Sequence, residues 1–154
     1  MEKSIVVGVD GSADSEAALA VAARLADRLG ARLVLANVVE HVQSPYATVA
    51  AIGPRAVAPA PLGEMLEAQV RAGERLLEEM AEQADVEAAE RRVVSGFAAE
   101  RLADLADEED AELIVVGSRG RGAFKAAFLG SVSTSLIGVA RRPVLVVPPG
   151  ARES

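Results

Sequence analysis

The 154-residue chain has no cysteine, no tryptophan and a single histidine, and aromatic residues make up 3% of it. The absence of cysteine excludes a disulfide framework, a thiol nucleophile and a thiolate metal site. One histidine is too few for a histidine-cluster zinc site or for most catalytic triads. The formal net charge of −7 argues against a nucleic-acid binder, because polyphosphate needs an extended basic surface. At first sight it also argues against any polyanionic ligand.

Long hydrophobic runs are missing as well. The longest uninterrupted apolar stretches, such as residues 17–23, are about seven residues long, whereas a membrane span needs roughly 20. The first residues, MEKSIVVGVD, enter a strand pattern directly and lack the features of a secretion signal. These absences predict a cytoplasmic protein that binds no membrane.

The apolar residues that are present, mostly alanine and valine, follow two periods. Short β-branched runs predict strands that are buried on both faces, at Ser4–Val9, Arg32–Val39, Glu90–Ser95, Glu112–Val116 and Pro143–Val147. Apolar residues three and four apart predict helices that follow Ser12 as N-cap and stop at Gly30, and that span Leu62–Ala84, Ala98–Asp110 and Gly130–Ala140.

This alternation predicts one α/β domain over residues 1–150, followed by a short tail at 151–154. We expect an open, Rossmann-like, five-stranded parallel sheet with the order 3-2-1-4-5 and helices on both faces. Residues 40–61 hold four of the seven prolines and no clear period, which predicts a long surface loop, with partial disorder as one interpretation. A loop of this length in a compact domain is unusual and often functional.

Ligands of such sheets bind at the carboxyl ends of the strands, where the strand order reverses. Here that point lies between the first and fourth strands. The turn after the first strand is acidic, because Asp10, Asp14 and Glu16 cluster there and would repel phosphate, and it lacks the G-x-G-x-x-G fingerprint. Asp10 either accepts hydrogen bonds from a sugar, faces a phosphate-bound metal, or only organises its turn.

The turn after the fourth strand has the opposite character. Its sequence from Gly117 to Gly122, GSRGRG, holds three glycines and two arginines, and no acidic residue occurs between Glu112 and Glu153. Glycines let backbone N–H groups approach an anion, and the helix that follows offers a positive dipole end. Ser131 and Ser133 add hydroxyl donors. The turn therefore predicts a phosphate site, the alternative being a flexible loop before an ordinary Ser-capped helix, and the net charge does not exclude a small triphosphate.

At these residues the sequence resembles the universal stress protein family, whose nucleotide-binding members carry G-x2-G-x9-G-[S/T] after the fourth strand. Gly117, Gly120, Gly130 and Ser131 fit that spacing. The resemblance also covers VVGVDGS, ELIVVGSRGRG, LGSVSTSL and RRPVLVVP, and spans about Ser4 to Pro148. It implies a fold of the adenine nucleotide alpha hydrolase type and an ATP ligand carried with Mg²⁺.

The resemblance also assigns site residues. The ribose and phosphates would be held through backbone and hydroxyl groups of Gly117, Arg119, Gly120, Gly130, Ser131, Val132 and Ser133. Asp10 matches a position near the ribose. Val9 and Val38 match positions that line adenine, and the backbone of Val38 would read the edge of the base.

The resemblance further implies a homodimer through the fifth strand. With the predicted order, Val144 to Val147 form a short apolar edge strand, and such edges are normally blunted or paired. Pairing with the same strand of a second copy would satisfy both edges with two-fold symmetry. The alternative is an edge covered by the tail of the chain, which is short and polar.

The sequence favours binding over catalysis. The Walker A pattern G-x4-G-K-[S/T] and the pyrophosphatase-type S-G-G-x-D-S loop are both absent, and His41 is interpreted as a surface residue. We therefore expect a non-catalytic, ATP-binding regulatory dimer of the stress response, with no metal site of its own. A cyclic-AMP-binding member and a nucleotide-independent dimeric interaction module are the alternatives, and slow ATP hydrolysis or self-phosphorylation at Ser131 or Ser133 stays open.

Overall fold

The structure is a computed structural model, and it describes residues 2–40, 62–120 and 129–151. Predictions that fall on residues 41–61 (among them His41), on residues 121–128 and on the tail 152–154 lie outside the described residues.

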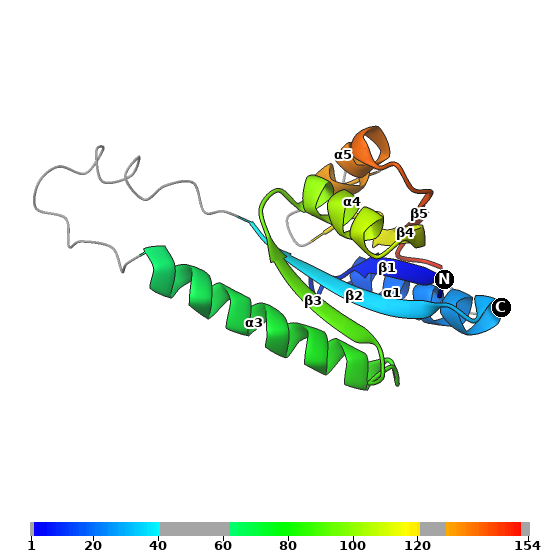
Figure 1. Cartoon of the computed structure of the whole chain (residues 1–154), viewed down its shortest axis with the longest axis horizontal. Helices are drawn as coiled ribbons and strands as arrows, with labels where there is room; N and C mark the ends of the chain where they lie inside the picture. Colours follow the sequence, from blue (N-terminus) through cyan, green and yellow to red (C-terminus); the bar gives the residue numbers. More distant parts are fainter. Residues whose placement is uncertain (1, 41–61, 121–128, 152–154) are drawn as a thin grey trace, which may run out of the picture.

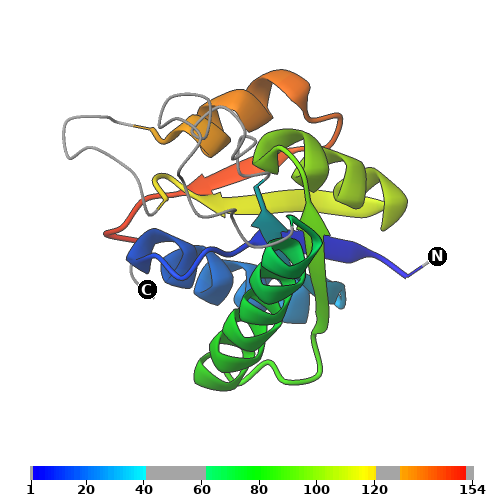
Figure 2. The ribbon, with the colours of Figure 1, turned by 90° about the vertical axis from the view of Figure 1, so that its left-hand side faces the viewer.

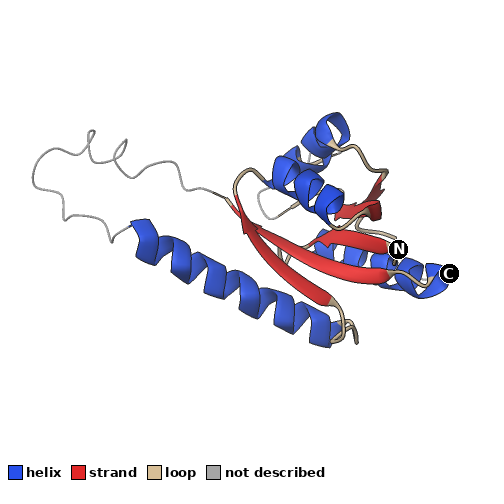
Figure 3. Ribbon diagram, in the orientation of Figure 1, coloured by secondary structure: helices blue, strands red, loops and turns tan. Residues whose placement is uncertain are grey.

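Five parallel strands form one sheet, and four described helices connect or flank them (Figures 1 and 3). The order of the strands is β3-β2-β1-β4-β5, which confirms the predicted fold and topology. In chain order the elements are β1 (Ser4–Gly8), α1 (Ala13–Leu29), β2 (Arg32–Val39), α3 (Leu62–Gln83), β3 (Glu90–Ser95), α4 (Ala98–Glu108), β4 (Ala111–Gly117), α5 (Ser131–Val139) and β5 (Val144–Val147).

The helices cover both faces of the sheet, as Figure 2 shows from the side. Helices α1 and α3 pack on one face, where Ile5 and Val7 meet Leu19 and Leu77 in one buried cluster. Helices α4 and α5 pack on the other face, against a second cluster that contains Val6. The alternation along β1 follows from the two-residue period of a strand, so a β-branched run with no polar face is the expected sequence of a sheet buried on both sides.

The ends of α1 follow from its cap residues. The Ser12 hydroxyl oxygen accepts a hydrogen bond from the Ser15 backbone N–H at 3.2 Å, as an N-cap does. Gly30 ends the helix with a left-handed φ of 60°, a conformation that glycine adopts without steric cost. Both predicted caps are confirmed. These ends fix where the turn after β1 begins, and that turn borders the site.

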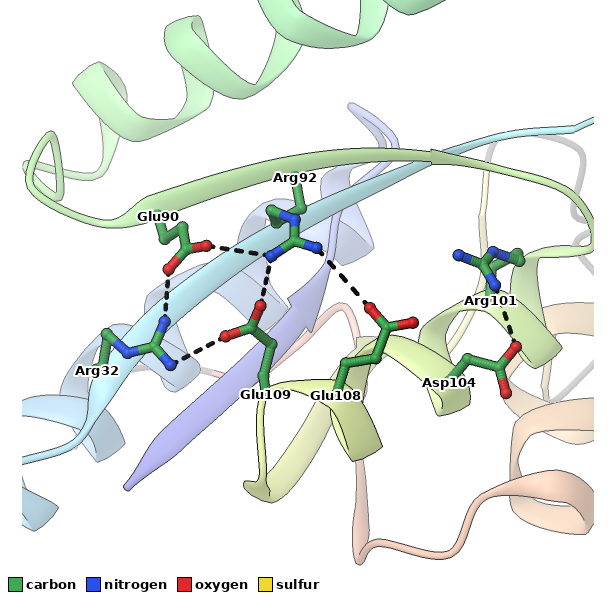
Figure 4. A network of polar contacts seen from close by, with 7 residues as sticks. All are labelled: Arg32, Glu90, Arg92, Arg101, Asp104, Glu108 and Glu109. Atoms are coloured by element: carbon green, nitrogen blue, oxygen red, sulfur yellow. Dashed lines mark hydrogen bonds and ion pairs between the residues drawn. The ribbon is translucent and has the colours of Figure 1, made fainter. Parts of the chain in front are cut away.

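A network of ion pairs holds the amino ends of β2 and β3 against the end of α4 (Figure 4). Arg32, the first residue of β2, pairs with Glu90 and Glu109, and Arg92 pairs with Glu90, Glu108 and Glu109. The hydrogen bond to Glu109 raises the pKa of Arg32. The network lies at the end of the sheet opposite to the carboxyl ends of the strands, so it connects β2, β3 and α4 without entering the site.

None of the described helices is both long and apolar enough to span a membrane.

Candidate functional site

A cavity of about 1160 Å³ opens at the carboxyl edge of the sheet, where β1 and β4 are neighbours. The ends of β1, β2 and β4, the first turns of α4 and α5 and one side of α3 form its wall. All ten residues predicted for the nucleotide site line this one cavity: Val9, Asp10, Val38, Gly117, Arg119, Gly120, Gly130, Ser131, Val132 and Ser133. The structure therefore brings the predicted set together, and the role of these residues toward a nucleotide stays a prediction.

The turn after β1 is organised by its own side chains. One carboxylate oxygen of Asp10, Oδ1, accepts from the backbone N–H of Ser12 at 2.9 Å. The Asp10 backbone N–H donates to the Ser15 hydroxyl oxygen at 3.3 Å, and this hydroxyl donates to the Ser12 carbonyl oxygen. The other carboxylate oxygen, Oδ2, lies 2.7 Å from the place where a Cβ of residue 120 would stand. Asp10 therefore organises its turn and also faces the turn after β4.

Asp14 connects α1 to the turn after β4, which the sequence reasoning missed. Its carboxylate oxygen Oδ2 accepts hydrogen bonds from the Ser118 hydroxyl at 2.8 Å and from the Arg119 backbone N–H at 2.9 Å. Arg119 Nε lies 3.6 Å from the same oxygen. Asp14 is only 7% exposed, so its charge is compensated inside the protein. The Asp14 carboxylate is therefore directed at protein groups, and the expectation that it would repel a phosphate stays a prediction.

The three glycines of the predicted motif stand where an added Cβ would be crowded. A Cβ on Gly117 would lie 2.7 Å from the Asp14 backbone carbon, so glycine is required for α1 to approach the end of β4. A Cβ on Gly130 would lie 3.2 Å from the Arg119 Cα atom. A Cβ on Gly120 would meet only the Asp10 carboxylate, which is the end of a side chain. Of the three, Gly120 is thus the position where an added Cβ would crowd a side chain that lines the cavity and no backbone atom.

The amino end of α5 presents backbone donors to the cavity. Gly130 is the N-cap and has no side chain to cap the helix, and no described residue accepts from the backbone N–H groups of Ser131 and Val132. These donors, together with the positive dipole end of the helix, suit an anion. The Ser133 hydroxyl is buried and donates to the Ser118 and Gly130 carbonyl oxygens, so its proton is directed at the protein, contrary to the expected donor role.

The opposite part of the cavity holds a backbone N–H and C=O on β2 that have no partner among the described residues. The Ala36 carbonyl oxygen accepts from Val9 N–H and faces β1, while the Val39 carbonyl oxygen accepts from Gly96 N–H and faces β3. Peptide groups alternate along a strand, so the N–H and C=O of Val38 face the β1 side. The β1–β2 register ends at Ala36, and no described residue pairs with the Val38 backbone on that side. A donor and an acceptor therefore stand next to each other at the cavity wall.

The charged side chains that line the described part of the cavity are of both signs. Arg75 and Arg119 are basic, and Asp10, Glu40 and Glu79 are acidic. Within the described ranges, no group of three or more histidine, aspartate or glutamate residues is arranged to hold a metal ion.

The open parallel sheet with a cavity at its switch point defines a Rossmann-like α/β domain, and comparison with known proteins identifies its family. The family model of the universal stress proteins matches residues 1–148, so the chain belongs to the universal stress protein family. Universal stress protein Rv2005c of Mycobacterium tuberculosis is 35% identical over 145 residues, which are 92% of this chain and 44% of that protein. A universal stress protein of Thermus aquaticus is 32% identical over 147 residues, 96% of this chain and 99% of that protein.

The chain thus spans less than half the length of some curated relatives and nearly the whole length of others.

Solved structures of the family are also similar. UspA of Lactobacillus plantarum superposes with a TM-score of 0.74 at 21% identity, covering 94% of this chain and 97% of that one. A universal stress protein in complex with cAMP has a TM-score of 0.67 at 27% identity, covering 94% and 96% of the two chains. A protein of Archaeoglobus fulgidus in complex with dAMP has a TM-score of 0.58 at 23% identity, covering 94% and 97%. The first and third likenesses concern the fold alone.

Two polar residues next to the predicted set escaped the sequence reasoning. Asn37 lines the cavity and donates to the Val9 carbonyl oxygen at 2.9 Å. Its signal in the sequence is a polar residue inside an otherwise apolar strand end, ANVV. The second is Ser118, whose signal is only that it stands between two residues of the glycine motif. The α3 side of the cavity, with Gln69 and Gly73, had no signal beyond helix periodicity.

Proposed function

We propose that the chain binds an adenine nucleotide at the carboxyl edge of its sheet, with ATP as the ligand, and that it acts as a regulatory dimer in the stress response. One observation carries this proposal: a single cavity is lined by helix N–H groups at Ser131 and Val132, and by a backbone donor and acceptor at Val38, none of which has a partner among the described residues. The N–H groups of Ser131 and Val132 suit phosphates, and the donor and acceptor of Val38 suit the edge of a base. A nucleotide has both groups in one molecule.

The adenine base would be recognised by the backbone N–H and C=O of Val38. Adenine presents an acceptor, N1, beside the donor amino group on C6, which is the complement of an N–H next to a C=O. Guanine presents a donor and an acceptor in the opposite order, so the same pair would face two like groups and leave them unpaired in a partly buried place, which is costly. The arrangement therefore supports adenine as the base.

The phosphates of ATP would be bound by the amino end of α5 and by the turn from Gly117 to Gly120. Backbone N–H groups and the helix dipole favour an anion there, and Arg119 adds a positive charge that it shares with Asp14. Because acidic and basic side chains are mixed around the cavity, we expect ATP to bind with Mg²⁺, which lowers the charge of the phosphates.

Calorimetric titration of the purified chain with ATP and Mg²⁺ tests this proposal, with GTP as the matched competitor. We expect saturable binding of ATP and much weaker binding of GTP. Gly120→Val should abolish ATP binding because its side chain displaces Asp10 and fills the approach to the turn. Gly63→Val, at a position where a Cβ meets nothing within 4 Å, is the control. Absence of ATP binding at millimolar concentration would overturn the proposal.

Cyclic AMP is the second candidate ligand, because a family member that is 27% identical was solved in complex with cAMP. The same base pocket would serve, and a single phosphate would contact fewer donors at the α5 amino end. Titration with cAMP and ATP side by side separates the two: a preference for ATP that is lost on removal of the β- and γ-phosphates favours the first reading.

The dimer would form through β5. The Pro143 and Val147 carbonyl oxygens accept from Ile114 and Ser118 and face β4, so by alternation the peptide groups of Val144 and Val146 face away from the sheet. Val146→Pro removes an outward N–H group and leaves the β4 ladder intact, since proline is tolerated on an edge strand. We expect a dimer by sedimentation for the wild type and for Val146→Ile, and a monomer for Val146→Pro. A monomeric wild type would refute the dimer.

We propose that the site binds the nucleotide and does not hydrolyse it. Ser133 donates its proton to two carbonyl oxygens, and no described residue next to it is a base that could activate it. Phosphate release no faster than that of a Gly130→Val variant is the result that this reading expects.

A further inference from the structure

Asn37 lies where three elements meet, next to Val38 in the wall of the cavity. Its amide nitrogen Nδ2 donates to the Val9 carbonyl oxygen, just past the end of β1. Its amide oxygen Oδ1 packs against α3, where a Cβ built on Gly73 would lie only 2.7 Å away. The side chain belongs to β2, in the middle of a β2–β3 register that pairs residue 37 with Val93. Asn37 therefore sits at the junction of β1, β2 and α3.

The acceptor that Asn37 uses is the one that a longer β1–β2 ladder would need. Val9 N–H already donates to the Ala36 carbonyl oxygen at 2.8 Å. In a parallel ladder the next bond along would run from Val38 N–H to the Val9 carbonyl oxygen. That bond is absent from the described residues, and the Asn37 amide holds its acceptor instead. The ladder consequently stops two residues before Val38.

We infer that Asn37 is a positioning residue that keeps the N–H group of Val38 unpaired and thereby keeps the β1–β2 ladder open at the base pocket. The side-chain amide substitutes for the backbone donor at Val9, so the Val9 carbonyl is satisfied without closing the strands. A buried carbonyl seeks a donor, and without Asn37 the nearest one of correct geometry is Val38 N–H. This part of the inference concerns the free protein and does not depend on a ligand.

A consequence for binding follows, and it rests on the proposed function. If Val38 N–H turns to Val9, the donor for adenine N1 is lost, while the Val38 carbonyl still faces the cavity. The base pocket then accepts a donor but no longer offers one. Loss of Asn37 should therefore weaken adenine nucleotides and reduce the preference for ATP over GTP, whereas the contacts at the α5 amino end are unchanged.

Amide hydrogen exchange on the full chain tests the inference, with Asn37→Leu as the variant, because leucine has nearly the same shape and no donor. In the free wild type we expect the Val38 amide to exchange much faster than the paired Ala36 amide. In Asn37→Leu we expect the Val38 amide to exchange about tenfold more slowly, as for one net hydrogen bond gained. Gln83→Leu, the same chemical change at an exposed position at the end of α3, should leave the Val38 amide unchanged.

The outcomes separate this inference from the function proposed above. A Val38 amide that is already protected in the free wild type, or that exchanges equally fast in Asn37→Leu, overturns the positioning role whatever the protein binds. Slower exchange in a protein that binds no nucleotide upholds the positioning role and rejects the proposed function. If ATP binds, Asn37→Leu should weaken it about tenfold and leave inorganic tripolyphosphate binding unchanged, since only the base contact is lost. Should Asn37→Leu fail to fold, Asn37→Asp, which also lacks the donor, and the wild-type measurement decide.

Discussion

The carboxylate of Asp14, on α1, accepts a hydrogen bond from the hydroxyl of Ser118, which lies beyond β4, at 2.8 Å. The two residues are 104 positions apart in the chain. The same carboxylate oxygen accepts from the Arg119 backbone N–H. A buried acid on another element thus holds the Ser118 side chain and the Arg119 peptide group in place before any ligand arrives.

Asp14→Ala should lower the free energy of unfolding by about 1–3 kcal/mol, because it leaves a buried hydroxyl and a backbone N–H without their acceptor. We also expect weaker ATP binding, since the turn loses its anchor. Chemical denaturation monitored by circular dichroism measures the first effect. Glu16→Ala, at an exposed acid in the same helical turn, should change stability by no more than about 0.5 kcal/mol. Equal losses of stability for both variants would show that the hydrogen bonds of Asp14 to Ser118 and Arg119 contribute no more than an exposed acid does.

Gly117→Ala should mainly lower stability, whereas Gly120→Ala should mainly weaken nucleotide binding. At residue 117 the new Cβ meets backbone atoms of Asp14, which cannot rotate away, so we expect a loss of about 1–3 kcal/mol in stability. At residue 120 it meets the end of the Asp10 side chain, which can rotate. Gly120→Ala should therefore melt close to the wild type and bind nucleotide less tightly. Thermal melting and titration of the same two samples check this, and a Gly120→Ala protein less stable than Gly117→Ala would contradict it.

Gly138→Ala should stabilise the protein by about 0.4–1 kcal/mol, because the residue lies inside α5, a Cβ there meets nothing within 4 Å, and alanine restricts the unfolded chain. The matched opposite case is Gly30→Ala. Gly30 has space for a Cβ too, but its φ of 60° strains an alanine, so this variant should be less stable than the wild type. Denaturation midpoints of the two variants should move in opposite directions, and a shift of both in one direction would refute the argument.

Asp107 should give the protein part of its acid sensitivity. The hydrogen bond from Arg142 holds the pKa of this carboxyl below its ordinary value of 3.8, with Arg141 acting in the same direction. A folded-state pKa below the unfolded one contributes stability that is present above the unfolded value and is lost as the pH falls through the folded value. Unfolding measured between neutral pH and strong acid should show wild type and Asp107→Asn converging below about pH 4. A constant difference at every pH would contradict this.

Much of the fold could be read from the sequence because the β-branched runs and the caps are local signals. Ser12 and Gly30 mark the ends of α1 by their own chemistry, and the runs at β1 and β4 have no polar face to hide. Asn37 and Asp14 could not be placed in the same way. Their partners, the Val9 carbonyl oxygen and Ser118, are brought near only by the packing of strands and helices that are far apart in sequence. The sequence shows that Asp14 carries a charge. Which groups its carboxylate faces depends on the packing of α1 against the end of β4, which no local pattern encodes.

The ion pairs of Arg32 and the backbone of Val38 stand at opposite ends of β2, a strand of eight residues, so that roughly 20 Å of sheet lies between them at 3.3 Å per residue. Free-energy changes at sites this far apart generally add. Substitutions in the network of Arg32 and Glu109 should therefore lower the melting temperature and leave the ligand-induced increase in that temperature nearly unchanged. Thermal stability and ligand recognition can in that case vary independently in this chain, and the protein can be tuned to a different working temperature without redesign of its binding edge.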